Sequence, residues 1–318
     1  MLVCHAMQHS GSATLFTHTH LMNTDLFLIG ADGGGSGTRI VLGDAHGREL
    51  AQAASGPSGL GLGIERAWQA ILAGCTEAFR QAGVAPQWER CVLGCGLAGF
   101  NNPDWLAAFR AQAPKLAGLA VEHDAYTTLL GAHGGAHGVI VALGTGSVAA
   151  AADGDGEYRI ASGFGFPSGD EASGAWLGLR AVVYAQQALD GRAALDALAQ
   201  ALLERVGARD RDGLILWLCS ANQTAYASLA PVVIAHASHP FAARLLKEAG
   251  EEIGKMIVAL DASGELPVAL CGGLGKPLRD YVPQHFQARL RAPLADSAHG
   301  AWQLAQQEAQ RLGLNLAA

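Results

Sequence analysis

The run Asp32-Gly-Gly-Gly-Ser-Gly-Thr-Arg39 lies between two short apolar segments, residues 26–29 and 40–42. An apolar run, a cluster of glycines and a second run rich in β-branched residues predict two strands joined by a tight turn. Glycine amides can approach phosphate oxygens closely, because no side chain blocks them and positive φ angles are accessible. Asp32, just before the turn, could hold a divalent metal that accompanies the phosphates. We interpret the run as one half of a phosphate clamp for ATP. A glycine-rich hairpin without a ligand is the alternative.

Two familiar nucleotide motifs are excluded. The chain contains no G-x-x-x-x-G-K-[ST] sequence, which rules out a P-loop. A dinucleotide fingerprint opens a helix, whereas the residues from Thr38 onward favour a strand.

Composition indicates a cytoplasmic α/β enzyme. The 318 residues are half hydrophobic, carry a net charge of −7 and have dispersed basic residues, which argues against nucleic acid or an anionic membrane as a partner. No apolar run approaches the ~20 residues of a membrane span. Six cysteines without a C-x-x-C pair indicate reduced thiols.

The first 24 residues differ from the rest. They carry four histidines and neither Lys nor Arg, so a signal peptide would lack its basic start. We expect residues 1–24 to be a disordered leader, or Met22 to be the true start. A metal site at His18-x-His20 is the less favoured reading.

The first half of the chain predicts the order βββαβαβα. After the opening hairpin we expect a strand, a long amphipathic helix, a buried strand, a short helix, a strand and a helix, at residues 48–54, 64–81, 91–95, 102–111, 119–123 and 126–132.

The same pattern then begins again. We expect strands at 138–143, 148–152, 156–161, 267–271 and 288–291, and helices at 171–189, across 193–260 and at 297–312. Each half has a glycine turn between its first two strands, at 33–37 and 144–146. The duplication predicts two like lobes, residues 25–134 and 135–318, facing each other across a cleft, with a helical insert at 193–260. The final helix could pack back on the N-terminal lobe. One large α/β sheet with incidental glycines is the alternative.

Four motifs in order carry a family resemblance. They are the run from Asp32 to Arg39, Leu143-Gly-Thr-Gly-Ser147, Gly169-Asp-Glu-Ala-Ser173 and Cys271-Gly-Gly-Leu274. Together they resemble the N-acetylglucosamine and glucosamine kinase group, which is related to activator ATPases and belongs to the superfamily of actin, sugar kinases and acetate kinase. The resemblance spans about residues 25–312 and implies two ribonuclease H-like, actin-like lobes. The usual Asp-Gly-Gly-Gly-Thr-Lys-Thr is altered here, with Ser36 and Gly37 replacing the first Thr and the Lys.

The resemblance implies an ATP-dependent kinase that phosphorylates the 6-hydroxyl of an amino sugar. Asp32 would hold Mg²⁺, through waters, because Mg²⁺ sheds its hydration reluctantly. The residues that would hold the nucleotide come from all three glycine turns: Gly33, Gly34, Gly35, Ser36, Thr38, Gly144, Thr145, Gly146, Ser147, Gly272 and Gly273.

Asp124 is the candidate general base. It leaves a strand of the first lobe toward the predicted cleft, and phosphoryl transfer needs one carboxylate to accept the hydroxyl proton. The family counterpart is an Asp before a small residue, and Ala125 follows here. A simple helix cap is the alternative role.

The adjacent acids Asp170 and Glu171 would border the sugar in this family. Asp170 would accept hydrogen bonds from ring hydroxyls, with Thr145 and Gly163 lining the same pocket. A buried carboxylate discriminates strongly, because the wrong sugar leaves it unpaired. Acids that open a helix are otherwise commonly caps matched to its dipole.

One position departs from the family pattern. Family members carry an Asn after Gly-Pro-x that contacts sugar hydroxyls, whereas this chain has Gly59 there. Ser58 could substitute, or the sugar could differ, which leaves the substrate's identity open.

Three functions remain to be separated. The leading one is a kinase of glucosamine or N-acetylglucosamine, with a small-molecule sugar as partner and a homodimer left open. An activator ATPase of a CoA-ester reductase or dehydratase would need exposed cysteines shared between subunits, whereas most cysteines here fall inside predicted strands or helices. A non-catalytic sugar sensor is disfavoured by the presence of Asp32 and Asp124.

Overall fold

Two five-stranded sheets organise the protein in the computed structural model, which describes residues 26–153 and 158–314. The leader expected at 1–24 lies outside these residues. Within the described ranges, no helix is long and apolar enough to cross a membrane.

The first sheet has the strand order β3-β2-β1-β4-β5. Its strands are β1 (Phe27–Gly33), β2 (Thr38–Asp44), β3 (Glu49–Ser55), β4 (Cys91–Leu97) and β5 (Gly118–His123). The first three strands are antiparallel, whereas β4 lies parallel to β1 and β5 parallel to β4. Asp32 pairs with Arg39 in the hairpin register, so the predicted glycine turn joins β1 and β2.

The second sheet repeats this arrangement with the order β8-β7-β6-β9-β10. Its strands are β6 (Gly138–Leu143), β7 (Ser147–Ala152), β8 (Tyr158–Ser162), β9 (Val268–Cys271) and β10 (Leu290–Arg291). The antiparallel and parallel pairings match those of the first sheet strand for strand. The prediction of two duplicated ribonuclease H-like lobes is therefore confirmed.

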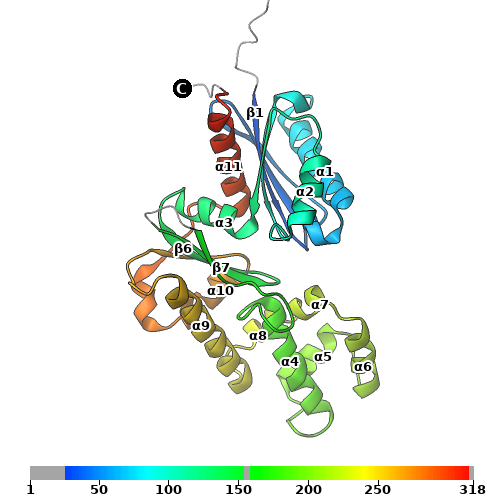
Figure 1. Ribbon diagram of the computed structural model, residues 1–318. Helices are drawn as coiled ribbons and strands as arrows, with labels where there is room; N and C mark the ends of the chain where they lie inside the picture. Colours follow the sequence, from blue (N-terminus) through cyan, green and yellow to red (C-terminus); the bar gives the residue numbers. More distant parts are fainter. Residues whose placement is uncertain (1–25, 154–157, 315–318) are drawn as a thin grey trace, which may run out of the picture.

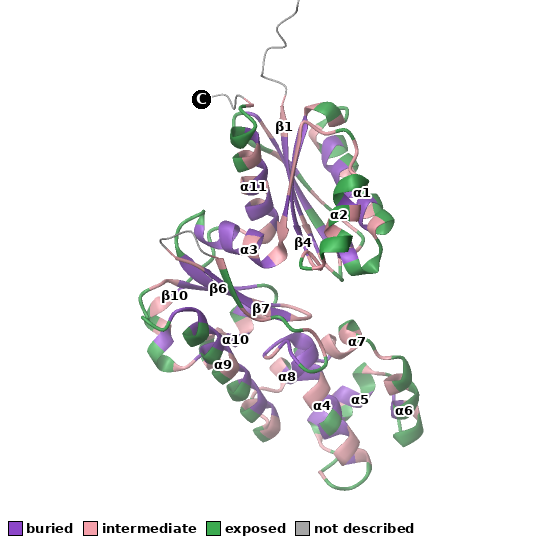
Figure 2. Cartoon of the chain, in the orientation of Figure 1, coloured by how far each residue is buried: buried purple, intermediate pink, exposed green. Residues whose placement is uncertain are grey.

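Helices cover both faces of the first sheet, with α1 (Ile64–Ala82) and α2 (Pro103–Ala111) on one side and α11 (Ser297–Arg311) on the other (Figure 1). All seven residues of β4 are accordingly buried (Figure 2). The α11 backbone lies directly on Gly94, because a Cβ there would be only 2.1 Å from the carbonyl oxygen of Ala301. Glycine in β4 thus allows the helix to approach the sheet.

The observed bounds of α1 agree with the helix predicted at 64–81, and its buried residues explain the agreement. Ile71, Cys75 and Phe79 recur at helical spacing and are fully buried against the sheet. Gly83 follows with a left-handed φ of 70°, a conformation that glycine adopts readily at a helix end. The next helix, α2, begins after Asn102, whose side chain accepts hydrogen bonds from the amides of Asp104 and Trp105.

The helical block predicted at 193–260 consists of several separate helices: α5 (Ala197–Arg205), α6 (Arg211–Ser220), α7 (Gln223–Ala227), α8 (Ala230–Ala235) and α9 (Pro240–Leu260). Helix α4 (Gly174–Leu189) precedes this block, and α10 (Gly275–Leu278) follows β9. Helices α5 and α6 lie away from the second sheet (Figure 1), whereas α9 packs against β6, β7 and β8. Short 3₁₀ turns occupy Leu60–Leu62, Trp88–Arg90, Arg279–Tyr281 and Gln284–Arg289.

Helix α4 begins three residues later than predicted. Asp170 and Ala172 have φ angles of 59° and 63°, which are incompatible with a right-handed helix. The helix therefore starts after Ser173, whose hydroxyl accepts a hydrogen bond from the amide of Trp176. This displaced start keeps Asp170 in a loop.

The two lobes are joined where α3 (Asp124–His133) crosses α11. A Cβ on Gly300 would lie 1.8 Å from the carbonyl oxygen of Thr127, and a Cβ on Gly131 would lie 2.1 Å from that of Asp296. The crossing is therefore possible only with glycine at both points. Helix α3 also packs on β6 and β7, while α11 packs on β1 and β4, so each helix covers the sheet of the other half.

We predict that Gly300→Ala destabilises the protein by about 1–3 kcal/mol or more, because the added methyl group must separate two packed helices. Urea unfolding of purified protein measures the change. Gly213→Ala is the matched control, since a Cβ there meets nothing nearer than 3.3 Å and alanine favours a helix by about 1 kcal/mol over glycine. Equal stability of the two variants would contradict this account of the crossing.

Candidate active site

A cavity of about 1240 Å³ lies between the two sheets and contains most of the predicted site residues. The predicted residues that line it are Asp32, Gly33, Gly34, Gly35, Ser36, Asp124, Gly144, Thr145, Gly146, Ser147, Gly163, Asp170 and Gly272. Residues predicted from both halves of the chain thus share one cavity.

The two glycine turns meet across this cavity. Ser36 Oγ lies 3.3 Å from Thr145 Oγ1, although 109 positions separate these residues in the chain. The amide of Gly34 donates to the carbonyl of Gly37, and the amide of Gly144 donates to that of Gly146, which closes each turn on itself. A Cβ on Gly34 would meet no atom within 4 Å, so the space above the first turn is open. Two open glycine turns that face each other can bind a chain of phosphates through their backbone amides.

Thr38 and Ser58 support the first turn from behind and do not line the cavity. Ser58 is fully buried, and its Oγ lies 2.6 Å from Thr38 Oγ1, which is also 2.7 Å from the carbonyl oxygen of Gly56. The amides of Ser58 and Gly59 both donate to the carbonyl of Gly34 at 3.1 Å. The structure therefore does not bring Ser58 to a place where it could contact a sugar.

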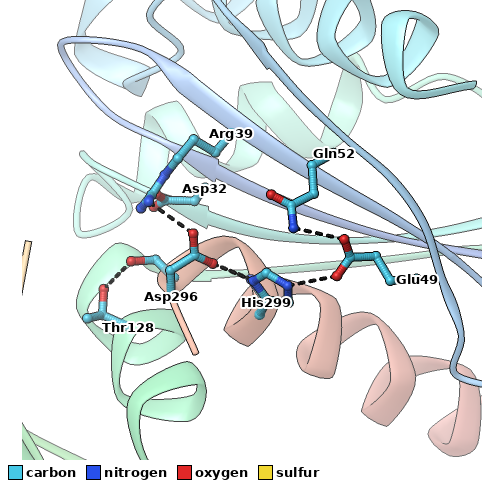
Figure 3. Close-up of polar contacts among 8 residues, drawn as sticks. Asp32, Arg39, Glu49, Gln52, Thr128, Asp296 and His299 are labelled. Atoms are coloured by element: carbon cyan, nitrogen blue, oxygen red, sulfur yellow. Dashed lines mark hydrogen bonds and ion pairs between the residues drawn. The ribbon is translucent and has the colours of Figure 1, made fainter. Parts of the chain in front are cut away.

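Asp32 projects from the end of β1 and pairs with Arg39 at 2.6 Å (Figure 3). Burial raises the pKa of Asp32, although the adjacent Arg39 guanidinium opposes that rise. Arg39 also reaches Asp296 at 3.0 Å, so its guanidinium lies between two carboxylates that line the cavity. This arrangement neutralises negative charge beside the first turn.

Asp296 connects this pair to a further chain of polar contacts (Figure 3). Its other oxygen lies 2.7 Å from Nδ1 of His299, and Nε2 of His299 lies 3.0 Å from Glu49. Burial disfavours a charged imidazole, but the hydrogen bonds to Asp296 and Glu49 outweigh it and raise the pKa of His299. His299 thus links α11 to β3.

Asp124 is the first residue of α3 and lines the cavity with about a third of its side chain exposed. Its carboxylate accepts a hydrogen bond from the amide of Ala125 at 2.8 Å. Its backbone carbonyl accepts hydrogen bonds from the hydroxyls of Thr127 and Thr128, at 3.0 and 2.8 Å. Thr128 Oγ1 lies 2.9 Å from Ser297 Oγ, so α11 contributes to holding the start of α3.

Asp170 is held in a left-handed conformation and is 5% exposed. Its carboxylate accepts hydrogen bonds from the amide of Gly165 at 3.2 Å and from Nε2 of Gln223 at 2.7 Å. Burial raises the pKa of Asp170, and these hydrogen bonds oppose the rise. Gln223 belongs to α7, so the helical insert reaches into the site.

Glu171 and Gly273 do not line the cavity, unlike their neighbours Asp170 and Gly272. The Glu171 carboxylate accepts a hydrogen bond from Ser162 at 2.7 Å, and its carbonyl accepts one from Ser147 at 2.6 Å. Glu171 therefore ties the second turn to the loop that precedes α4.

The sequence patterns did not predict a place in the site for several residues that line the cavity: Arg39, Asn101, His123, Thr128, Gln223, Lys276, Asp296 and Ser297. Arg39 ends the run that begins at Asp32, and Asp296-Ser297 has the form of a helix start, so a local sequence pattern could have indicated both sites. No sequence pattern near Gln223 indicates a site residue, because only tertiary packing brings α7 to the cavity.

The chain is similar to known sugar kinases over most of its length. The sequence model of the BadF/BadG/BcrA/BcrD ATPase family matches residues 29–305, which include both glycine turns. The glucosamine kinase GspK of Vibrio cholerae is 30% identical over 278 residues, covering 86% of this chain and 94% of that protein. The N-acetylmuramic acid/N-acetylglucosamine kinase of Clostridium acetobutylicum is 27% identical over 239 residues, covering 71% of this chain and 76% of that protein.

A solved structure shares both the fold and much of the sequence. It is that of a candidate N-acetylglucosamine kinase from Chromobacterium violaceum, with a TM-score of 0.86 and 50% identity, and it covers 89% of this chain and 99% of that one.

We predict that His299→Gln destabilises the protein more at pH 6 than at pH 9. The folded pKa of His299 lies above the ordinary value of 6.5, so its stabilising charge is fully present below about pH 6.5 and is lost as pH rises through the folded pKa. Urea unfolding of both proteins at the two pH values tests this. His46→Gln, at an exposed position in the β2–β3 turn, is the control. A destabilisation that is equal at both pH values, or larger at pH 9, would show that His299 acts uncharged.

Proposed function

We propose that this chain, which belongs to the BadF/BadG/BcrA/BcrD ATPase family and is an ATP-dependent carbohydrate kinase, phosphorylates the 6-hydroxyl of glucosamine or N-acetylglucosamine. The observation that carries the proposal is the 3.3 Å contact between Ser36 and Thr145. It brings two open glycine turns together in the cavity that also holds Asp124 and Asp170.

The phosphates of ATP would lie between the two turns. Backbone amides can surround phosphate oxygens there without steric interference from side chains. Arg39 already lies beside the first turn and could neutralise charge on the transferred group. Gly272, at the start of the β9–α10 connection, would face the nucleoside.

Asp32 fits a role in holding Mg²⁺. Its carboxylate supplies a hard oxygen ligand at the cavity wall, and the described residues contain no group of three or more His, Cys, Asp or Glu that could form a complete metal site. An ion that keeps most of its waters and binds phosphates needs only such a carboxylate. When bound, Mg²⁺ would neutralise charge on the phosphates.

Asp124 would accept the proton of the sugar's 6-hydroxyl as that oxygen attacks the γ-phosphorus. Its fixed backbone and partial exposure suit a group that must meet an incoming hydroxyl. Positioning and charge neutralisation supply most of the catalysis in phosphoryl transfer, and the base accepts the proton of the attacking hydroxyl.

Asp170 would bind ring hydroxyls of the sugar, with Gly163 and Thr145 beside it. Gln223 holds this carboxylate and could itself donate to the substrate. The relatives act on both the free and the N-acetylated amino sugar, so the proposal covers both.

The activator-ATPase alternative has less support. Such a protein would need exposed cysteines at a subunit boundary, and among the described cysteines Cys75, Cys91, Cys95 and Cys271 are buried, while Cys219 is exposed.

The primary test is a screen for sugar-dependent ADP release across amino sugars and hexoses. We expect glucosamine or N-acetylglucosamine to give the highest kcat/KM. Asp124→Asn should lower kcat by about 10²-fold or more, because general-base catalysis contributes that much. Near-full turnover by this variant would refute the assignment of Asp124, and a protein that releases no ADP with any sugar would refute the kinase proposal.

A second variant tests the sugar site. Asp170→Asn should raise the KM for the sugar about 10- to 100-fold, because hydrogen bonds to a charged group contribute about 1.5–3 kcal/mol each. Steady-state kinetics with ATP saturating measures this change. The neighbouring carboxylate is the comparison: Glu171→Gln, which faces Ser162 outside the cavity, should keep the wild-type KM. If both variants change the KM equally, Asp170 has no special place in sugar binding.

A further inference from the structure

We propose that Asp170 selects the substrate by charge: its buried carboxylate pairs with an ammonium group, so the preferred sugar carries a free amine and not an N-acetyl group. The inference deepens the proposed function and rests on it, because it takes the acceptor of that reaction as the ligand. It concerns the loop before α4, where Asp170 lines the cavity.

Asp170 is a buried carboxylate without a cationic partner. It is 5% exposed, and it accepts hydrogen bonds from two neutral groups, the amide of Gly165 at 3.2 Å and Nε2 of Gln223 at 2.7 Å. In the part of the chain that the structure describes, no Lys, Arg or His forms an ion pair with it. Because buried carboxylates are rarely left without a compensating charge, Asp170 offers a negative charge that a ligand can compensate.

Asp261 shows how the protein itself compensates a carboxylate that is buried to the same degree. Asp261 is 6% exposed and pairs with the guanidinium of Arg289. Burial would raise the pKa of Asp261, but hydrogen bonds and the charge of Arg289 outweigh it and lower that pKa. For Asp170 burial is the largest influence and raises the pKa, with the charge of Glu171 adding to the rise. A cationic partner therefore distinguishes Asp261 from Asp170.

The Lys and Arg side chains that line the cavity come from other elements. Arg39 is engaged in the ion pairs beside the first glycine turn. Lys276, Arg279 and Arg291 belong to α10, the 3₁₀ turn after it and β10. Strand β10 lies at one edge of the second sheet, whereas Asp170 follows β8, which lies at the opposite edge. Among the described residues, the edge that carries Asp170 therefore supplies no cation to the cavity.

The Asp170 carboxylate can receive an ammonium and keep its present hydrogen bonds. A carboxylate has about four acceptor sites, of which Gly165 and Gln223 each use one. A Cβ on Gly146 would lie 2.5 Å from Oδ2, so the carboxylate adjoins the second glycine turn. In glucosamine the amine has hydroxyls on both neighbouring carbons, so the ammonium and a ring hydroxyl can bind the carboxylate together. Acetylation removes the positive charge and leaves a single N–H donor.

A purely structural role is the alternative. Asp170 would then only tie its loop to α7, through Gly165 and Gln223. Replacing its charge would weaken the binding of every sugar to a similar degree. An ion pair with the ligand instead predicts a loss that falls mainly on the charged sugar, so a series of sugars separates the two roles.

Calorimetric titration of the wild-type protein with glucosamine, glucose and N-acetylglucosamine, at pH 7 and without nucleotide, is the first arm of the test. Glucose has a hydroxyl where glucosamine has the amine, and an amine with the pKa of an α-amino group, about 8, is mostly charged at this pH. Glucosamine should bind about 10- to 100-fold more tightly than either neutral sugar, the range expected for a hydrogen bond to a charged group. Equal affinities, or tighter binding of N-acetylglucosamine, would overturn the inference.

The second arm repeats the titrations with two variants. Asp170→Asn should lower the affinity for glucosamine about 10- to 100-fold, to near that for glucose, while the neutral sugars lose much less. Glu171→Gln is the matched control, because it removes the adjacent negative charge outside the cavity and should keep the preference for glucosamine. An equal loss for all three sugars in Asp170→Asn would show that Asp170 acts only on the loop. Loss of the preference in Glu171→Gln would also overturn the inference.

Phosphorylation assays separate failure of this inference from failure of the proposed function. An enzyme with a higher kcat/KM for N-acetylglucosamine than for glucosamine would keep the proposed function and overturn the role of Asp170. A protein that binds glucosamine selectively but releases no ADP would refute the proposed function, while the titrations would still support the ion pair at Asp170.

Discussion

The contact between the backbones of α3 and α11 determines how the rest of the molecule is arranged. Gly300 and Gly131 allow the two helices to touch at the carbonyls of Thr127 and Asp296. Each helix covers the sheet of the opposite half, so this crossing fixes one sheet relative to the other. Both helices also begin at the cavity. The same contact that joins the lobes therefore places Asp124 and Asp296 on one wall of the site.

This geometry brings several carboxylates together in the cavity. Asp32, Asp124, Asp170 and Asp296 all line the cavity, which under the proposed function would also receive the phosphates of ATP. Arg39 compensates part of this charge, since it pairs with both Asp32 and Asp296. Hydrogen bonds from His299, together with the charge of Arg39, outweigh burial and lower the pKa of Asp296, which keeps that carboxylate available as a partner.

Local sequence patterns predicted the strands and the two glycine turns, because hairpin chemistry and apolar runs act over a few residues. The repetition of the whole pattern in the second half predicted that the two turns converge, and Ser36 and Thr145 do meet. Local patterns also placed Asp124 at the exit of a strand, and the structure has it there, at the cavity wall, while its role as general base stays a prediction. They failed where the outcome depends on packing between distant segments. Ser58 and Thr38 proved to be buried supports of the first turn, and Glu171 faces Ser162 although it adjoins Asp170 in sequence. Gln223 reaches Asp170 across 53 positions, a contact that no local pattern encodes.

The central claim is that both glycine turns bind one nucleotide while Asp124 faces the acceptor. A crystal structure with a non-hydrolysable ATP analogue, Mg²⁺ and glucosamine tests it most directly. The account predicts that the γ-phosphate contacts residues 34–36 and 144–146 together, with the 6-hydroxyl of the sugar within hydrogen-bonding distance of the Asp124 carboxylate. A nucleotide bound by only one turn, or a sugar whose 6-hydroxyl lies away from Asp124, would contradict it.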